Sequence, residues 1–259
     1  MVSLTAAELT DQFREAGIER GDSILVHSSL KSLGHVQHGA DAVVQALVDA
    51  VGSDGTVLFP TLTGSAHDSA ANPPEFHCLT AKCWTGAIPE TARQYSTALR
   101  SLHPTHSVAA IGRLADWFAS GHELVSSPCG FGSPYDKLAD IGGKIILIGV
   151  TQSSNTSFHM AEEIAGVPYV LQDEPVDAIV VDADGGRLEF RTRVHLWGAR
   201  RDYDALEPQM IDLGICHIRT VGNAEVRVID AMFQRMFLIR KLLEDPLAVL
   251  AASERVNWI

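Results

Sequence analysis

Hydrophobic and polar positions follow two different periods along this chain. Residues 23–27, 55–60 and 144–150 are short apolar runs bounded by polar residues or glycine, as is typical of buried strands. Residues 40–51 instead carry valine and leucine at helical spacing and stop before a glycine, which predicts an amphipathic helix. Strands and helices of this kind together predict an α/β fold.

Capping and turn residues mark further elements. Thr5 and Glu8 have the spacing of a capping box, and Ser133 followed by Pro134 fits the N-cap and first position of another helix. Asp184-Gly185-Gly186 separates two alternating runs, so residues 176–194 are expected to form a β-hairpin insertion. A stripe of Met and Phe in the last predicted helix is interpreted as core. The other predicted elements are helices at 88–98, 113–120 and 206–213, and strands within 100–112 and around 218 and 226.

Composition limits the partners that the chain can have. Its 259 residues are 46% hydrophobic, enough to bury one large core, so we expect a single domain over residues 1–259. The net charge of −12 argues against nucleic acid and membrane surfaces, which need clustered lysine and arginine, and suits a cationic ligand. The four cysteines include no C-x-x-C pair, which favours a reducing compartment. No apolar run has membrane length and no signal-peptide pattern is present, so a cytoplasmic protein is expected.

Residues 61–84 form a long segment rich in Ser, Ala, Asn, Pro and His, without periodicity. The segment is longer than a simple connection needs, so we expect a lid or a pocket wall. His67, His77, Cys78 and Cys83 lie within it, but their spacing is irregular and contains no paired ligand motif. No metal site is expected.

A histidine near the start of a predicted helix is the main candidate for chemistry. A Ser/Asn/Thr cluster after the strand at 144–150 offers several N-cap oxygens for a helix that Gly166 stops. At helical spacing Thr156, His159 and Glu163 share one face. Imidazole, with an ordinary pKa of about 6.5, is suited to act as a general base. The alternative is a structural histidine that satisfies a backbone group.

Residues 28–34 form a loop of small hydroxylic residues directly after a predicted strand. Backbone N–H groups and hydroxyls at the carboxyl end of a strand can bind phosphate, and Lys31 adds a positive charge. The alternative is an ordinary connection, since neither a P-loop nor a G-x-G-x-x-G pattern is present. A serine hydrolase is disfavoured because the chain contains no G-x-S-x-G motif.

Four segments together resemble the aminoglycoside 3-N-acetyltransferase family. Their order and spacing match that family, and they are His27 to Gly34, His103 to Gly112, the Gly-Ser-Pro at 132–134 leading to Lys144, and Asn155 to Glu162. The resemblance implies a single-domain α/β/α sandwich around a mixed central sheet, unlike the common acetyltransferase fold. The pyrophosphate-loop pattern of that common fold matches residues 219–224, but a strand follows there instead of the required helix.

The resemblance also implies a reaction. An acetyl group would pass from acetyl-CoA, with no metal, directly to a primary amine, the 3-amino group of the deoxystreptamine ring of an aminoglycoside antibiotic. Two other functions stay open from the sequence: N-acylation of a non-antibiotic amine by an acyl-CoA, and non-catalytic binding of coenzyme A or a sugar phosphate. A homodimer is a further expectation.

The resemblance assigns roles at matching positions. His159 matches the catalytic base, Thr156 is placed to contact the thioester, and Asp202 is the nearest match to the acid that orients the histidine. Asp202 is a departure, because relatives carry glutamate in a Glu-Tyr-Asp context. The predicted coenzyme-binding residues are Ser28, Ser29, Leu30, Lys31, Ser32, Leu33, Ser107, Gly132, Ser133 and Tyr135.

The predicted substrate contacts are Glu162, Glu163 and His77. The two glutamates could attract a polycationic substrate, or they could be solvated acids on a helix. His77 stands where relatives tend to carry aspartate, so an anionic contact for an ammonium group is missing at that position.

Overall fold

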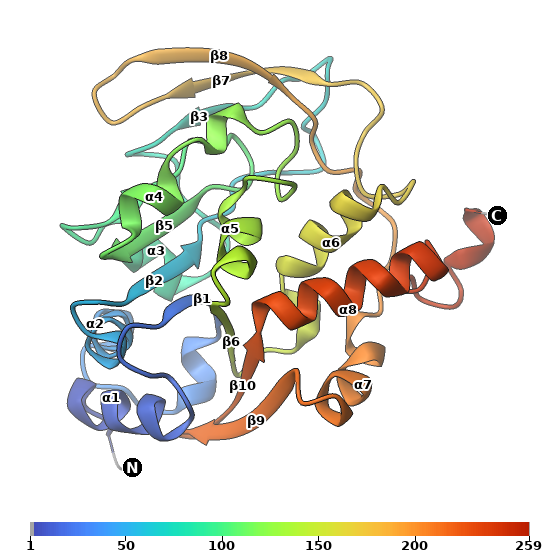
Figure 1. Ribbon diagram of the computed structural model, residues 1–259. Coiled ribbons are helices and arrows are strands. Elements are labelled where there is room, and N and C mark those ends of the chain that lie inside the picture. Colours follow the sequence, from blue (N-terminus) through green and yellow to red (C-terminus); the bar gives the residue numbers. More distant parts are fainter. Residues whose placement is uncertain (1–2, 259) are drawn as a thin grey trace.

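A seven-stranded mixed sheet forms the centre of the computed structural model, which describes residues 3–258 (Figure 1). Its strand order is β4-β5-β2-β1-β6-β10-β9. The middle strands β2, β1 and β6 are parallel, whereas each outer strand runs antiparallel to its inner neighbour. The strands are β1 (Ser23–Ser28), β2 (Thr56–Pro60), β4 (Leu99–Arg100), β5 (Val108–Gly112), β6 (Lys144–Ile148), β9 (Cys216–Val221) and β10 (Ala224–Asp230). The predicted mixed central sheet is confirmed.

Helices cover both faces of this sheet. Strand β1 shows why, because Ile24 and Val26 point into one hydrophobic core and Leu25 points into the other. A strand buried on both faces reads as a continuous apolar run, which is the pattern seen in the sequence. One face carries α1 (Ala6–Glu15), α2 (Gly39–Val51) and α3 (Ala87–Ala92); the other carries α4 (Ala115–Ala119), α5 (Pro134–Asp140), α6 (Ser157–Ala165), α7 (Glu207–Asp212) and α8 (Ala231–Glu244). The α/β/α sandwich is therefore confirmed.

Both helix starts predicted from capping residues are confirmed. The Thr5 hydroxyl accepts a hydrogen bond from the Glu8 backbone N–H at 3.2 Å, and the Glu8 carboxylate accepts one from the Thr5 backbone N–H at 2.8 Å. Ser133 caps α5, whose first residue is Pro134. The predicted helix at 88–98 is shorter, since α3 ends at Ala92 and the chain then turns toward β4.

A second sheet lies above the first in Figure 1 and has the order β3-β7-β8. The predicted hairpin supplies β7 (Val176–Val181) and β8 (Arg187–Thr192). β3 (Glu75–His77), from the long segment at 61–84, pairs with β7 in parallel. Phe76 of β3 and Val180 of β7 are partners in this pairing and are buried in the same small cluster. The segment expected to be a lid is thus partly held by a short strand.

Helix α8 corrects one prediction. Phe233, Met236 and Leu243 from its Met and Phe stripe are exposed, whereas Leu238 and Leu242 are buried. The interpretation of the stripe as core is therefore wrong for these three residues, whereas Phe237, Ile239 and Leu242 of the same stripe pack against the core. Among residues 3–258, no helix has the length and apolar character needed to cross a membrane.

Candidate active site

A cavity of ≈ 570 Å³ lies at the carboxyl ends of the parallel strands. Ser28 at the end of β1 and Pro60 at the end of β2 line it, together with Val150 just beyond β6. The start of α6 and the segment at 195–203 complete the wall. Open α/β sheets bind their ligands at this edge, so the topology itself points to the cavity as the site.

The first turn of α6 brings His159 to the cavity wall. Asn155 begins the helix by accepting a hydrogen bond from the Ser157 backbone N–H at 3.1 Å. Phe158 and Met160, on either side of the histidine, are buried and anchor the helix in the core. The His159 side chain remains 25% exposed, which is enough to reach a molecule in the cavity.

Glu162 holds the imidazole of His159 through Nδ1. Its Oε2 lies 2.7 Å from Nδ1, and the Tyr203 hydroxyl donates to the same oxygen at 2.8 Å. Arg201 Nε donates to the other carboxylate oxygen, Oε1, at 3.3 Å. Both oxygens of the buried carboxylate are therefore satisfied within the protein. The nitrogen of His159 that remains for a ligand is Nε2.

The neighbours of Glu162 keep its carboxylate ionised. Burial raises the pKa of Glu162, but the hydrogen bond and charge of His159, with Arg201 and Tyr203, outweigh burial and lower it overall. Burial raises the pKa of Tyr203 well above its ordinary value, so the hydroxyl keeps its proton. An ionised Glu162 accepts a hydrogen bond from Nδ1–H of His159, and this tautomer leaves a lone pair on Nε2. His159 can therefore act as a general base toward the cavity.

Thr156 and His27 meet beside His159. The Thr156 backbone N–H donates to Nε2 of His27 at 3.4 Å, and all three residues line the cavity. Burial, with a smaller contribution from the charge of His159, lowers the pKa of His27 to about 3, so its ring is neutral. His27 belongs to one of the four family-like segments, but the sequence predicts no role for its side chain. Its position near the end of a buried strand is the sequence feature that points to the site.

The structure corrects the assignment of the orienting acid. Asp202 is exposed and, within residues 3–258, its carboxylate makes no hydrogen bond to His159. Its backbone N–H instead donates to the Val249 carbonyl at 2.8 Å. Arg201 and Tyr203, on either side of Asp202 in the sequence, are the residues that contact Glu162. The i,i+3 spacing of His159 and Glu162 was the sequence feature that could have identified the correct partner.

Glu163 and Glu162 are not placed to attract a substrate, contrary to the prediction. Glu163 is buried, and both of its oxygens accept from the Cys129 backbone N–H, at 2.9 and 3.0 Å. One of them also lies 2.6 Å from Nε2 of His195. Burial raises the pKa of Glu163 to about 7, while hydrogen bonds from the Ser127 side chain and the Cys129 backbone act in the opposite direction. Each glutamate contacts a histidine of the protein, so its carboxylate is not free to bind a substrate ammonium group.

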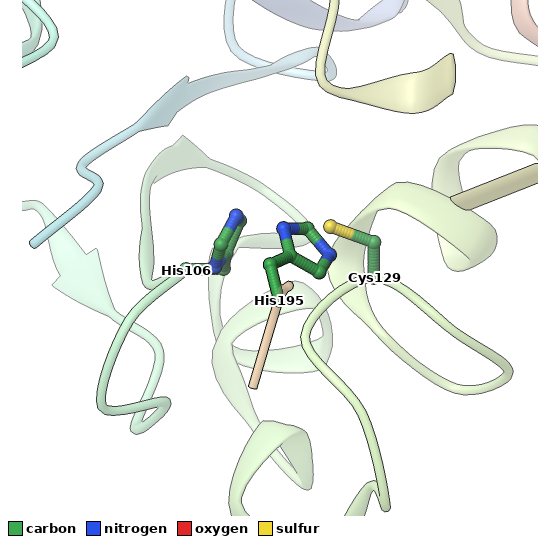
Figure 2. Close-up of side chains that lie close together, drawn as sticks. All are labelled: His106, Cys129 and His195. Carbon is green, nitrogen blue, oxygen red and sulfur yellow. The ribbon is translucent and has the colours of Figure 1, made fainter. Parts of the chain in front are cut away.

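His195 also belongs to a second cluster, shown in Figure 2. His106, Cys129 and His195 each present one potential ligand atom, and these atoms lie within 4.8 Å of one another. Burial lowers the pKa of both histidines well below the ordinary value, so the rings are neutral, and raises that of the Cys129 thiol, which keeps its proton. Nitrogen and sulfur donors of this kind could hold zinc only after the thiol loses its proton. The three residues come from separate segments, so their spacing in the sequence gave no indication of the cluster.

Within the predicted coenzyme loop, Ser28 reaches the cavity. Its Oγ is buried and has no hydrogen-bond partner in residues 3–258, which leaves it available to a ligand. The rest of the loop forms the 3₁₀ helix η1 (Leu30–Leu33). Leu33 is buried in the core, and the Ser32 hydroxyl donates to the Ser29 carbonyl at 2.7 Å. Lys31 is exposed.

The other predicted coenzyme contacts are used inside the protein or lie away from the cavity. The Ser107 hydroxyl donates to the Thr61 carbonyl at 2.9 Å, and Ser133 caps α5. Tyr135 is fully buried and donates to a backbone carbonyl at 3.4 Å. These three residues and the exposed Gly132 are not part of the cavity wall. The same turn and capping residues occur in binding loops and in structural loops. The sequence therefore does not distinguish a coenzyme contact from a structural hydrogen bond at these positions.

His77 also lies away from the cavity. It is exposed on β3, with Nε2 3.1 Å from the Glu75 carboxylate. The parallel pairing of β3 with β7 directs this residue to the second sheet. Trp84, at the end of the same segment, does line the cavity, so residues 61–84 contribute to the wall through their two ends.

The fold and the site together define an α/β/α protein that presents a carboxylate-held histidine to a ligand cavity at the carboxyl ends of its parallel strands. The family described as aminoglycoside 3-N-acetyltransferase matches residues 25–239. The chain belongs to this family, as its resemblance to that family in four segments indicated.

Relatives of known name support the same assignment. One aminoglycoside N(3)-acetyltransferase III from Salmonella sp is 34% identical over 244 residues, which cover 86% of this chain and 81% of the relative. Another of the same name and source is 34% identical over 178 residues, so the match spans 63% of this chain and 62% of that relative. The structure of AAC-IIIb in a binary complex with CoASH has a TM-score of 0.82 at 24% identity, over 94% of this chain and 97% of its own, and shows the shared fold. AAC-VIa bound to sisomicin has a TM-score of 0.78 at 27% identity, over 93% of this chain and 98% of its own.

Proposed function

We propose that this protein transfers the acetyl group of acetyl-CoA to the 3-amino group of the deoxystreptamine ring of an aminoglycoside. The observation that carries the proposal is the position of His159, which is held by Glu162 at 2.7 Å and lines the same cavity as Ser28. Family membership agrees with it, as do the relatives described with CoASH and with sisomicin.

The proposed mechanism is direct transfer with His159 as base. An amine attacks a thioester only through its lone pair. As the new N–C bond forms, the amine loses a proton and the C–S bond breaks, so that coenzyme A leaves as its thiol. His159 Nε2 accepts that proton, and the resulting imidazolium is stabilised by the charge of Glu162 on the opposite nitrogen. Tyr203 and Arg201 keep the carboxylate in place during the step.

Polar groups at the ends of β1 and β6 would hold the acetyl donor. Acetyl-CoA supplies an activated acetyl group when it is bound. Thr156 is proposed to contact the thioester, and the unpartnered hydroxyl of Ser28 fits a polar ligand at the same wall. Lys31, exposed just outside, would contribute positive charge toward the phosphates of the coenzyme.

A thiol-release assay with acetyl-CoA and sisomicin tests the function. We expect turnover by the wild-type protein and a loss of about 10²–10⁴-fold in kcat for His159→Ala, the usual range for a general base. Coenzyme affinity, measured by calorimetry, should stay unchanged. His77→Ala is the matched control, because this histidine is exposed and outside the cavity. Undiminished turnover by His159→Ala would overturn the mechanism.

We also propose that the chain forms one domain and acts in the cytoplasm, where acetyl-CoA is available. A homodimer is part of the same proposal. Exposed apolar side chains on α8, among them Phe233, Met236 and Leu243, are compatible with an assembly that covers them. Light scattering coupled to size-exclusion chromatography gives the mass in solution. A monomer at working concentration would remove the dimer from the proposal and leave the reaction intact.

A further inference from the structure

Among the residues that the structure describes, the cavity wall contains no carboxylate. Within residues 3–258, none of the side chains that line the cavity belongs to Asp or Glu. The neighbouring carboxylates of Glu162 and Glu163 are buried and bonded to protein groups. The guanidinium of Arg201, which also lines the wall, is paired with Glu162. A cationic amine in this cavity therefore has no ion-pair partner there.

Two indole side chains offer the cavity a different means of binding a cation. Trp84 and Trp197 line it and are 58% and 46% exposed. Trp84 Nε1 donates to the Gly64 carbonyl at 3.0 Å, which fixes the ring at the end of the segment 61–84. In the described chain neither indole is stacked on another aromatic ring or covered by a Lys or Arg side chain. Their faces are open to a ligand.

We propose that Trp84 and Trp197 determine the binding of the amine substrate, by receiving its ammonium groups and sugar faces in place of carboxylates. The inference rests on the proposed function and specifies how its site recognises the acceptor. An indole face attracts a nearby cation through its quadrupole and also packs against the apolar face of a sugar ring. The acceptors that fit are amino sugars and aminocyclitols, which combine both features.

A wall without carboxylates also suits the chemistry. A carboxylate beside the reacting amine would stabilise its protonated form and raise the amine pKa. The amine must instead reach His159 in a state from which a proton can leave. An indole attracts the cation through its ring face and carries no charged oxygen that accepts the ammonium protons, so it holds the substrate without fixing a proton on the reacting nitrogen.

Paired substitutions of each tryptophan separate cation binding from simple packing. Trp84→Leu and Trp197→Leu remove the aromatic face but keep an apolar side chain, whereas Trp84→Phe and Trp197→Phe retain a face of smaller area. We expect each Leu variant to raise KM for sisomicin about tenfold with kcat nearly unchanged, and each Phe variant to recover most of the loss. Trp117→Leu is the matched control, since Trp117 is partly exposed on α4, beside Phe118 and outside the cavity.

Binding is also measured without turnover, by quenching of tryptophan fluorescence as sisomicin is added. The quench should be retained in Trp117→Leu and largely lost in the double variant Trp84→Leu/Trp197→Leu. If sisomicin quenches the fluorescence of the wild-type protein but no thiol is released, the proposed acetyl transfer is wrong and the proposed binding of the amine by the two tryptophans is supported. Turnover with unchanged KM in both Leu variants, equal losses in the Leu and Phe variants, or no binding at all would overturn the inference.

Discussion

The Glu162 carboxylate lies 2.7 Å from Nδ1 of His159, three residues away on the same helix. A pair placed on one helical turn keeps its geometry without help from a loop. The groups that come from elsewhere, Tyr203 and Arg201, contact the carboxylate, and Tyr203 also lies 3.1 Å from Nδ1. The orientation of the base is therefore set within α6 and reinforced from η4 (Tyr203–Leu206) and the residues before it.

Glu162→Gln should lower kcat by about 10²–10⁴-fold while leaving affinity for acetyl-CoA unchanged. The amide has nearly the same shape, but it carries no charge to stabilise the imidazolium and can hold the wrong tautomer of His159. Steady-state kinetics and calorimetry measure the two quantities. Asp202→Asn is the control and should keep the wild-type rate, because Asp202 is exposed and turned away from the ring. The opposite result for the two variants would restore Asp202 as the orienting acid.

Tyr203→Phe should have a smaller effect, a fall of about tenfold in kcat. The variant loses the hydroxyl that donates to Glu162 at 2.8 Å, but Phe158 still stacks on the ring, with centroids 4.2 Å apart. Loss of one hydrogen bond to a buried charged group should also cost about 1.5–3 kcal/mol of unfolding free energy. Kinetics and urea unfolding on the same preparation report both. A wild-type rate together with lower stability would restrict Tyr203 to a structural role.

Local features of the fold could be predicted from the sequence because neighbouring residues determine them. The capping box at Thr5 and Glu8, the apolar run of β1 and the hairpin around Gly185 all depend on contacts within a few positions. The pairing of β3 with β7 joins Phe76 to Val180, about a hundred residues apart, and no local pattern encodes it. The exposed part of the stripe on α8 is likewise not encoded locally, because the packing partners of a helix decide which of its faces is buried.

The candidate site divides in the same way. His159 could be predicted because a polar helix start after a buried strand is a local pattern and the family motif covers it. The role of Glu162 was missed, although its spacing is local, because a buried carboxylate and a solvated one look alike in sequence. The cluster of His106, Cys129 and His195 draws on three segments that only the tertiary fold brings together.

Lys31→Ala should weaken binding of acetyl-CoA about two- to fivefold at low salt and have almost no effect at high salt. Lys31 is exposed within the loop that begins at Ser28, so its attraction to phosphate acts through water and is screened by ions. Calorimetric titrations at two ionic strengths provide the comparison. Equal affinities of wild type and variant at low salt would show that backbone N–H groups and hydroxyls bind the coenzyme without this charge.

Buried histidines should make the fold sensitive to acid. Burial is the main cause that lowers the pKa of His27 and His122 to about 3 each, while an unfolded histidine titrates near 6.5. Between these values the unfolded chain binds protons that the folded protein does not, so stability is present above about pH 6.5 and is lost as the pH falls. At about pH 5 each such histidine costs roughly 2 kcal/mol. Glu163, with its pKa raised to about 7, has the opposite effect: the folded protein binds its proton first, so acidification adds stability. This gain offsets the loss from about one histidine.

His122→Gln tests this account at one position. Nε2 of His122 lies 3.0 Å from the Pro128 carbonyl and Nδ1 lies 2.8 Å from the Ser101 hydroxyl, contacts that a glutamine can partly replace. Urea unfolding at about pH 7.5 and pH 5 should show a loss of stability on acidification that is roughly 2 kcal/mol smaller in the variant than in wild type. His217→Gln, on the exposed side of β9, should leave the loss unchanged. An identical loss in His122→Gln and wild type would mean that His122 takes up its proton without unfolding.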